Sequence, residues 1–321
     1  MIVLGCLVSL PLFILGIIRT DKSITLPGDT TIVSDFVQIE GASSSKGSFE
    51  TIFVMSIDHS TILQNFLAGL SYKNEIDDIT ESYLHFTDYE LSKMGYIQHQ
   101  SSIMYSLILA YSEASKIDSS IHLEYEFDAF VISYYGPSSS FRIGDRILGV
   151  NNIYASDDFE LFRDNFNNMK LNDTFHVERE GKMIDIVLDE NSYKKIGGYA
   201  YYNINTETAF PKYELIPQNV GGPSGGLLQT LALYDALLEE DITKGRMIAG
   251  TGTIDSNGNV GEIGGIMQKI YTAYNDGIDI FLCPSENYED ALIAYNNLPD
   301  DSMKLYKVST FAEALEVLLY E

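Results

Sequence analysis

The sequence predicts an α+β protein with a transmembrane helix at its N-terminus, on three observations. Residues 1–18 form an uninterrupted apolar run. A segment rich in β-branched and aromatic residues at 49–57 is typical of a strand, and a helical pattern follows over 60–116. Glycine-rich turns in the last third of the chain separate further helical and strand-like segments. The 321 residues correspond to about two domains at roughly 150 residues each.

The N-terminal run indicates a membrane anchor over residues 1–20. MIVLGCLVSLPLFILGII has no charged side chain before Arg19, and 18 apolar residues at about 1.5 Å each nearly cross a hydrocarbon core about 30 Å thick. A signal peptide would need a small-x-small cleavage site, which the following residues lack, and a core helix would have a polar face. We therefore expect an uncleaved single-pass anchor in the cell membrane. Arg19 and Lys22 follow the run, so charge alone does not orient it.

Residues 21–118 are expected to contain a linker, the strand and helices. Ile103, Leu107 and Tyr111 recur four residues apart, as on one face of a helix. Tyrosines and acidic residues are frequent in this part of the chain, which favours a solvated helical layer.

Residues 119–192 have the pattern of a separate unit. The expected elements are a strand, a strand–turn–strand segment, a helix and a hairpin, at 130–133, 141–152, 157–166 and 175–188. This order, with FRIGDRIL at 141–148, resembles a PDZ domain of the bacterial type. The resemblance implies that a peptide adds as a strand. In this chain the family's carboxylate-binding loop would lie near Glu126, Phe127, Asp128 and Ala129, and the expected peptide site comprises Phe127, Asp128, Ala129 and Phe130. This segment lacks the family's glycine and carries acids, which favours an internal peptide or a regulatory role over capture of a free C-terminal carboxylate.

The chemistry is expected between residues 220 and 270. VGGPSGG at 220–226 precedes an apolar helical pattern, so Ser224 lies in a glycine-walled turn at a helix start. Its hydroxyl would be exposed, and backbone N–H groups there could hold an oxyanion. An ordinary N-cap serine accounts for this segment equally well. GPSGG also fits the G-x-S-x-G pattern of α/β-hydrolases, but that fold needs a histidine after the serine, and none follows His176.

A base for Ser224 would therefore be a lysine. The lysines that follow it are Lys244, Lys269, Lys304 and Lys307. Lys269 shares a helical face with Ile266 and Ile270, so burial would lower its pKa and keep the amine neutral, as a general base requires. The nearby helix start acts in the same direction. A lysine that lies along the helix edge with its amine in solvent is the common alternative.

Two motifs at fixed spacing make the pattern specific. GGPSGG at 221–226 and AGTGTIDSNGNVGEIGGIMQK at 249–269 resemble the proteolytic domain of Lon-type serine peptidases, over residues 193–321. Ser224 and Lys269 are 45 positions apart, as in that family. The resemblance implies that Ser224 is the nucleophile, Lys269 the base and Thr251 the residue that holds the lysine, with Gly222 and Gly225 supporting the loop. Gly225 stands where the family usually has alanine.

With the expected anchor and PDZ-like unit, the whole chain resembles membrane-anchored PDZ–Lon serine peptidases. The resemblance implies that the PDZ-like domain is inserted in the peptidase, between its amino-terminal part at 21–118 and the remainder at 193–321. It also implies that the catalytic part is extracellular and acts at the cell surface on peptides or on unfolded or flexible proteins. An oligomer is left open. The alternative is a membrane-tethered PDZ peptide-binding module with an inactive peptidase scaffold.

The composition excludes several other classes. Hydrophobic residues make up 45% and charged residues 21%, so wholesale disorder is excluded. The formal charge of −26 argues against nucleic-acid binding. Cys6 and Cys283 lack a CxxC partner and the histidines show no HExxH spacing, so no disulfide scaffold, metal or other cofactor is expected. No GxxxxGK[ST] motif occurs, so we expect a peptidase that acts without ATP.

Overall fold

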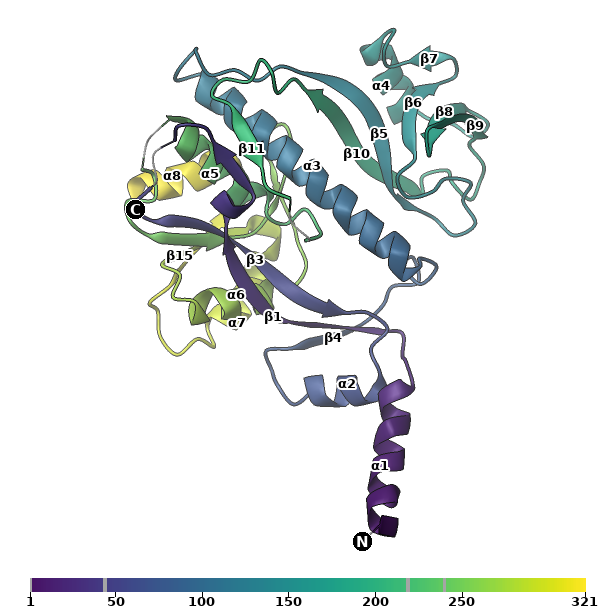
Figure 1. Ribbon diagram of the computed structural model, residues 1–321, viewed down its shortest axis with the longest axis vertical. Helices are drawn as coiled ribbons and strands as arrows, with labels where there is room; N and C mark the ends of the chain where they lie inside the picture. The colour runs from purple at the N-terminus through teal and green to yellow at the C-terminus, as the bar shows by residue number, and fades with distance from the viewer. Residues whose placement is uncertain (1, 43–44, 218–219, 239–240) are drawn as a thin grey trace.

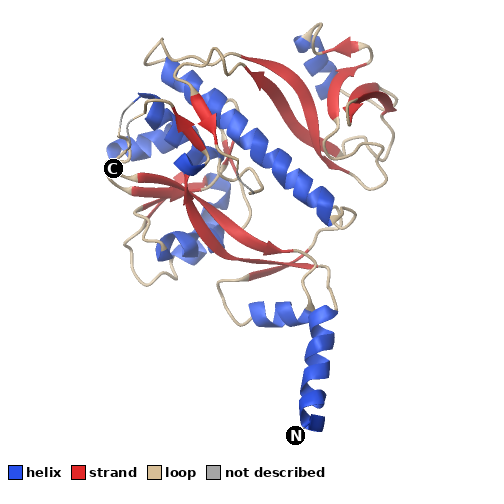
Figure 2. Ribbon diagram, viewed as in Figure 1, coloured by secondary structure: helices blue, strands red, loops and turns tan. Residues whose placement is uncertain are grey.

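The chain forms two β-sheets with a long helix, α3, between them (Figure 1). The computed structural model describes the chain except residues 1, 43–44, 218–219 and 239–240. The helices are α1 (Ile2–Ile17), α2 (Ile62–Ala68), α3 (Asp88–Ser115), α4 (Phe159–Asn167), α5 (Gly226–Leu238), α6 (Ile266–Asn275), α7 (Tyr288–Tyr295) and α8 (Phe311–Tyr320), with 3-10 turns η1 (Val33–Asp35) and η2 (Ser285–Asn287). Helices and strands are distributed through both parts, as an α+β class requires (Figure 2).

The expected transmembrane anchor at residues 1–20 was wrong. In the described part of the chain, no helix combines the length and the apolar character that a membrane span needs. α1 has 16 residues, which is about 24 Å at 1.5 Å each and short of the roughly 30 Å of a hydrocarbon core. The helix ends because Arg19 pairs with Thr61 and Thr20 N–H donates to Ser60 O at 2.9 Å, which fixes these residues as extended chain. The single-pass location in the cell membrane therefore has no support.

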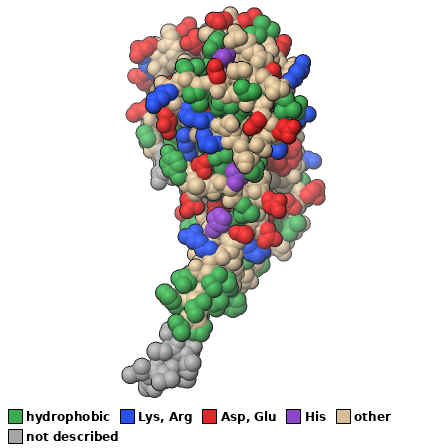
Figure 3. Space-filling view, turned by 90° about the vertical axis from the view of Figure 1, so that its right-hand side faces the viewer, with side chains coloured by type: hydrophobic (Ala, Val, Ile, Leu, Met, Phe, Trp, Pro, Cys, Tyr) green, Lys and Arg blue, Asp and Glu red, His purple; other side chains and the backbone are tan. Residues whose placement is uncertain are grey.

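Apolar side chains of α1 and α2 remain exposed at one end of the molecule (Figure 3). Phe13 is 65% and Phe66 66% exposed, and Gly16 lies against Leu63 where the two helices meet. From Leu10 to Ile17, where the structure describes the side chains, this helix contributes to none of the hydrophobic cores.

The first sheet is mixed, and its parallel strands are covered on both faces. Its strands in spatial order are β16 (Lys304–Val308), β15 (Ile280–Pro284), β12 (Met247–Gly250), β3 (Ser48–Ile57), β1 (Lys22–Ile32) and β4 (Glu75–Asp78). The strands from β16 to β3 are parallel, and β1 is antiparallel to both β3 and β4. Alternate side chains of the parallel strands enter opposite cores: Ile248 and Leu282 pack with α3, α5 and α8, whereas Ala249 and Phe281 pack with α6 and α7.

The second sheet is antiparallel and has its own core. Its strands in spatial order are β10 (Ile196–Ile204), β5 (Tyr125–Tyr135), β6 (Arg146–Val150), β8 (Thr174–Arg179) and β9 (Lys182–Val187), with β7 (Ile153–Tyr154) beside β6. Further short pairs are β2 (Val37–Ile39) with β11 (Tyr213–Leu215) and β13 (Thr253–Ile254) with β14 (Val260–Gly261). The turn in FRIGDRIL forms because Gly144 takes a φ of +87° and buried Asp145 accepts from the N–H of Arg142 at 2.8 Å.

α3 connects the two cores, and the expected solvated helical layer was wrong for it. Its capping box of Thr87 and Glu90 fixes the start. Early residues such as Ile97 join the core of the second sheet, whereas Leu107 and Tyr111 join that of the first. Most of the helix from Met94 onward is buried, because α5 packs against it on the side of the first sheet and β5 and β10 pack against it on the side of the second (Figure 1).

Candidate active site

Ser224 lies in a turn just before α5, and a second turn holds it in place. Gly222, with a φ of +89°, lets the chain reverse two residues earlier. The carbonyl oxygen of Ser224 accepts from the N–H of Gly252 at 2.8 Å and from Oγ1 of Thr251 at 3.1 Å. A Cβ at Gly225 would lie 3.1 Å from Nε2 of Gln229, so glycine suits this crowded position.

Lys269 reaches Ser224 from α6, across the end of the parallel strands. Its Nζ lies 2.9 Å from Oγ of Ser224 and 2.9 Å from Oγ1 of Thr251. Gly265, with a φ of +70°, begins the helix and packs against Val54, which sets the direction of α6. The structure therefore brings together the three polar side chains that the sequence predicted, from three separate segments.

Burial sets the electrostatics of this site. Lys269 is 2% exposed, and the desolvation of its ammonium form lowers its pKa from 10.5 to about 7. Thr251 is fully buried beside it. A substantial fraction of Lys269 is thus neutral near pH 7, and a neutral amine at 2.9 Å from a hydroxyl can accept its proton. The alternative of a lysine along the helix edge with a solvated amine does not describe this side chain.

A cleft of about 690 Å³ opens beside these groups. Its walls are β3 from Ile52 to Ser56, the loop at 221–224 and the segment at 262–265. β12 pairs with β3 only over residues 48–51. β3 pairs with β1 along its other edge, but beyond residue 51 the edge that faced β12 has no strand partner among the residues that the structure describes. This edge lines the cleft, and its backbone groups can bind extended chain.

The comparison with known families agrees with this geometry. Residues 201–321 match the Lon protease (S16) C-terminal proteolytic domain. The match implies a serine peptidase, and the matched range contains Ser224, Thr251 and Lys269. It does not reach the unit at 119–192, so the PDZ-like interpretation of that unit stays a prediction.

Curated relatives of this Lon-type region are also Lon proteases. The chain is 31% identical over 149 residues to the Lon protease of Campylobacter jejuni, which covers 43% of this chain and 18% of the relative. It is 29% identical over 131 residues to that of Endomicrobium trichonymphae, covering 41% and 14%. It is 37% identical over 101 residues to that of Porphyromonas gingivalis, covering 31% and 12%. The chain thus spans less than a fifth of the length of these relatives.

The expected peptide site of the PDZ-like unit lies in β5, where a strand of the chain itself already pairs. Phe127 is opposite Tyr202 of β10, and Phe130 is opposite Ala200. Asp128 lies at a register shift and accepts from Nη2 of Arg146 at 2.8 Å. A peptide could add to this edge only by displacing β10.

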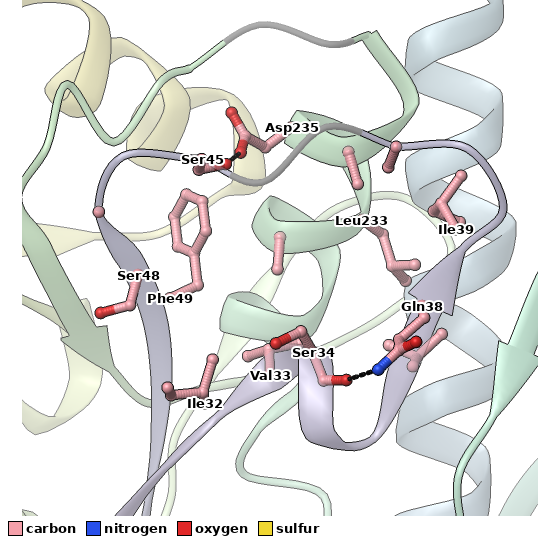
Figure 4. A pocket seen from close by; sticks show the side chains of 15 residues that line it. Ile32, Val33, Ser34, Gln38, Ile39, Ser45, Ser48, Phe49, Leu233 and Asp235 are labelled. Atoms are coloured by element: carbon pink, nitrogen blue, oxygen red, sulfur yellow. Dashed lines mark hydrogen bonds between the residues drawn. The ribbon is translucent and has the colours of Figure 1, made fainter.

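A separate cavity of about 470 Å³ lies between residues 32–49 and α5 (Figure 4). Its walls are mostly apolar, and its buried carboxylate, Asp235, accepts from Ser45 and from the N–H of Ile242 at 2.8 Å. The described residues that line it include no lysine or histidine that could activate its serines. The cleft at Ser224 is therefore the candidate active site of the Lon-type region.

Residues of α3 beside the serine turn were not predicted from sequence. Oγ of Ser102 donates to Pro223 O at 3.1 Å, and Oγ of Ser106 donates to Gly226 O at 3.0 Å. Both serines precede the turn by about 120 positions. The sequence offered one indication of their role. Ser102 and Ser106 are small polar residues four positions apart within an otherwise apolar segment, which is unusual for a helix face that packs in a core.

Proposed function

We propose that this chain is a serine endopeptidase in which Ser224 is the nucleophile and Lys269 the general base. The observation that carries the proposal is the 2.9 Å distance between Oγ of Ser224 and a buried amine whose pKa is about 7. The Lon-type match of the surrounding residues supports it independently.

The chemistry balances with these two groups and water. The hydroxyl proton of Ser224 passes to Nζ of Lys269 as Oγ bonds to the scissile carbonyl carbon. The C–N bond then breaks, and the leaving amine takes the proton from Lys269. Lys269 then takes a proton from water as the water oxygen bonds to the acyl carbon. The Oγ–C bond breaks, Oγ of Ser224 takes the proton back from Lys269, and the new carboxyl group is released. Thr251 keeps the amine directed at Ser224, since its Oγ1 contacts both Nζ and the Ser224 carbonyl.

Backbone N–H groups at Ser224 are suited to hold the oxyanion. The N–H of Gly222 donates to Gly95 O and that of Gly226 to Pro223 O. Within the described residues, the N–H groups of Ser224 and Gly225 have no such acceptor, so they are available for a developing negative charge. Gly222 and Gly225 support this turn through its backbone shape.

The cleft favours extended, unfolded substrate. A strand laid along the free edge of β3 would bring its main chain past Ser224, whereas a folded domain does not fit a cleft of this size. Every group that the hydrolysis needs lies in this chain, so we expect cleavage of short peptides and unfolded proteins without nucleotide.

The test incubates the full chain with an unstructured protein and a peptide library, without nucleotide, and identifies products by mass spectrometry. Ser224→Ala and Lys269→Ala should each abolish cleavage. Lys307→Ala, which changes an exposed lysine of β16, should leave it intact. Cleavage that survives Ser224→Ala would refute the nucleophile. A folded chain that binds peptides without cutting them would instead favour the binding-module alternative.

A further inference from the structure

One face of α3 lies along the turn that carries Ser224. Gly95 O accepts from the N–H of Gly222 at 2.9 Å, and buried His99 lies against the backbone of the same residue. Further along this face, Ser102 donates to Pro223 O and Ser106 to Gly226 O. These α3 positions are separated by four, three and four residues, which places them on one side of a helix.

The contact of Ser102 acts on the peptide bond that precedes the nucleophile. Pro223 O and the N–H of Ser224 belong to one planar peptide unit, in which a trans bond directs C=O and N–H to opposite sides. Because Ser102 holds the carbonyl on the α3 side at 3.1 Å, the N–H must point away from α3. The N–H therefore lies on the face of the turn opposite Ser102, and Ser224 itself lines the cleft.

The neighbouring peptide unit is held in the same manner from another element. The carbonyl of Ser224 accepts from the N–H of Gly252 and from Thr251, which fixes the plane that contains the N–H of Gly225. Without such bonds a glycine-rich turn samples many backbone conformations. Pro223 O also accepts from the N–H of Gly226 at 3.3 Å, so Ser102 and Gly226 hold one plane of the turn through its carbonyl oxygen and residues 251–252 hold the other.

We propose that Ser102 is a positioning residue for the oxyanion site, because its hydroxyl sets the direction of the Ser224 N–H. The proposal rests on the proposed function. Ser102 is 2% exposed, and its one hydroxyl proton is shared between Pro223 O at 3.1 Å and Oε1 of Gln229, a buried side chain of α5, at 3.2 Å. Ser102 does not touch substrate; it acts through the peptide unit that does.

The neighbouring residue in α3 supplies a matched control. Ser101 is 1% exposed, but its hydroxyl donates to Gln98 O at 2.8 Å, within its own helix. Ser101→Ala and Ser102→Ala each delete one buried hydroxyl from adjacent positions. A general effect of losing a buried hydroxyl appears in both variants, whereas an effect on the oxyanion site appears only in Ser102→Ala.

The test compares kcat, KM and inhibition by a peptide boronic acid, which mimics the tetrahedral intermediate. Ser102→Ala should lower kcat about tenfold with little change in KM, a smaller loss than the 10²–10³ typical of deleting an oxyanion donor. Boronate affinity should fall by about the same factor, and Ser102→Thr, which keeps a hydroxyl, should recover part of both. Ser101→Ala should change neither.

The outcomes separate this inference from the proposed function. Equal kinetic losses in Ser101→Ala and Ser102→Ala, or a loss in KM alone, would overturn the positioning role and leave the Ser224 mechanism standing. An undiminished boronate affinity in Ser102→Ala would overturn it as well. If the parent chain shows no cleavage that depends on Ser224, the proposed function itself fails. Circular dichroism and thermal melting of each variant show whether it is folded.

Discussion

Lys269 combines a position that favours catalysis with one that costs stability. Its amine is almost wholly buried against Ser224 and Thr251, so the charged form is disfavoured. A pKa of about 7 keeps the amine proton-free in much of the population at neutral pH while leaving it basic enough to take a proton. The lowered pKa of Lys269 leads to two measurable predictions.

The first prediction concerns the pH dependence of cleavage. Because only the neutral amine accepts the proton of Ser224, kcat/KM should rise with pH and level off above a midpoint near 7, the pKa of Lys269. One unit below the midpoint it should be about tenfold lower than at the plateau. Initial rates for a fluorogenic peptide at low concentration across pH measure this. A midpoint near the ordinary pKa of lysine would contradict the assignment.

The second prediction concerns stability. The unfolded chain holds the Lys269 proton up to about pH 10.4, whereas the folded chain holds it only below about 7. The unfolded state thus binds more protons between these values, and folding stability rises with pH over that window. Lys269→Met removes this penalty, so it should be inactive yet melt at higher temperature than the parent near pH 7, with the difference fading toward about pH 10.4. Lys307→Met, at an exposed site, should show no such trend.

At the scale of elements, the turn at 251–252 connects the groups of the site. Thr251 contacts Lys269, and the N–H of Gly252 holds Ser224 O. Gly252 has a φ of +148°, and a Cβ there would lie 2.6 Å from Cγ1 of Val260 in β14. This position therefore tolerates no side chain without moving the turn.

The third prediction follows from that turn. Gly252→Ala should lower the free energy of unfolding by about 1–3 kcal/mol through strain and overpacking. It should also reduce kcat at least tenfold, because Ser224 and Thr251 shift together. Gly277→Ala is the matched control: its φ is +74°, but a Cβ there meets nothing within 4 Å, so it should cost stability and not kcat. Thermal unfolding and kinetics of both variants check this, and equal kcat losses would contradict it.

The elements that the sequence predicted correctly are those determined by residues close to one another in the chain. The strand at 49–57, the serine turn and the buried face of Lys269 follow from neighbouring residues, and β3, the turn and α6 lie where they were expected. The end of α1 depends instead on a pairing with Thr61, some 40 residues later, which no local pattern reveals. The burial of α3 likewise depends on two sheets that the chain completes far downstream.

β10 shows the same limit within the second sheet. It pairs with β5 from Ile196 opposite Tyr135 to Ile204 opposite Tyr125. It also contacts α3, because the hydroxyl of Tyr105 in that helix donates to Ala200 O of β10 at 2.9 Å. The sequence predicts a strand only at 130–133, with a loop near 126–129, whereas β5 spans Tyr125–Tyr135, and the pattern does not reveal its partner. The expected peptide edge is thus occupied by chain that leads into the Lon-type region.

At the scale of the whole molecule, charge should govern which substrates reach the cleft. The formal charge is −26, and acidic side chains are spread over the face seen in Figure 3. Glu262 is exposed and lines the cleft itself. Such a field raises the local concentration of cationic chains and repels acidic ones, and salt screens it.

The fourth prediction is a charge preference that salt removes. At about 0.1 M salt, a lysine-rich unfolded peptide should be cleaved with a several-fold higher kcat/KM than an acidic peptide of the same length and cleavage site. The difference should shrink at about 1 M, where the Debye length falls from about 10 Å to about 3 Å. Glu262→Gln should reduce the preference more than Glu316→Gln at an exposed position of α8, because Glu262 lines the cleft and Glu316 does not. Equal effects would mean that the overall charge steers the substrate, and no preference at low salt would mean that main-chain pairing along β3 selects it.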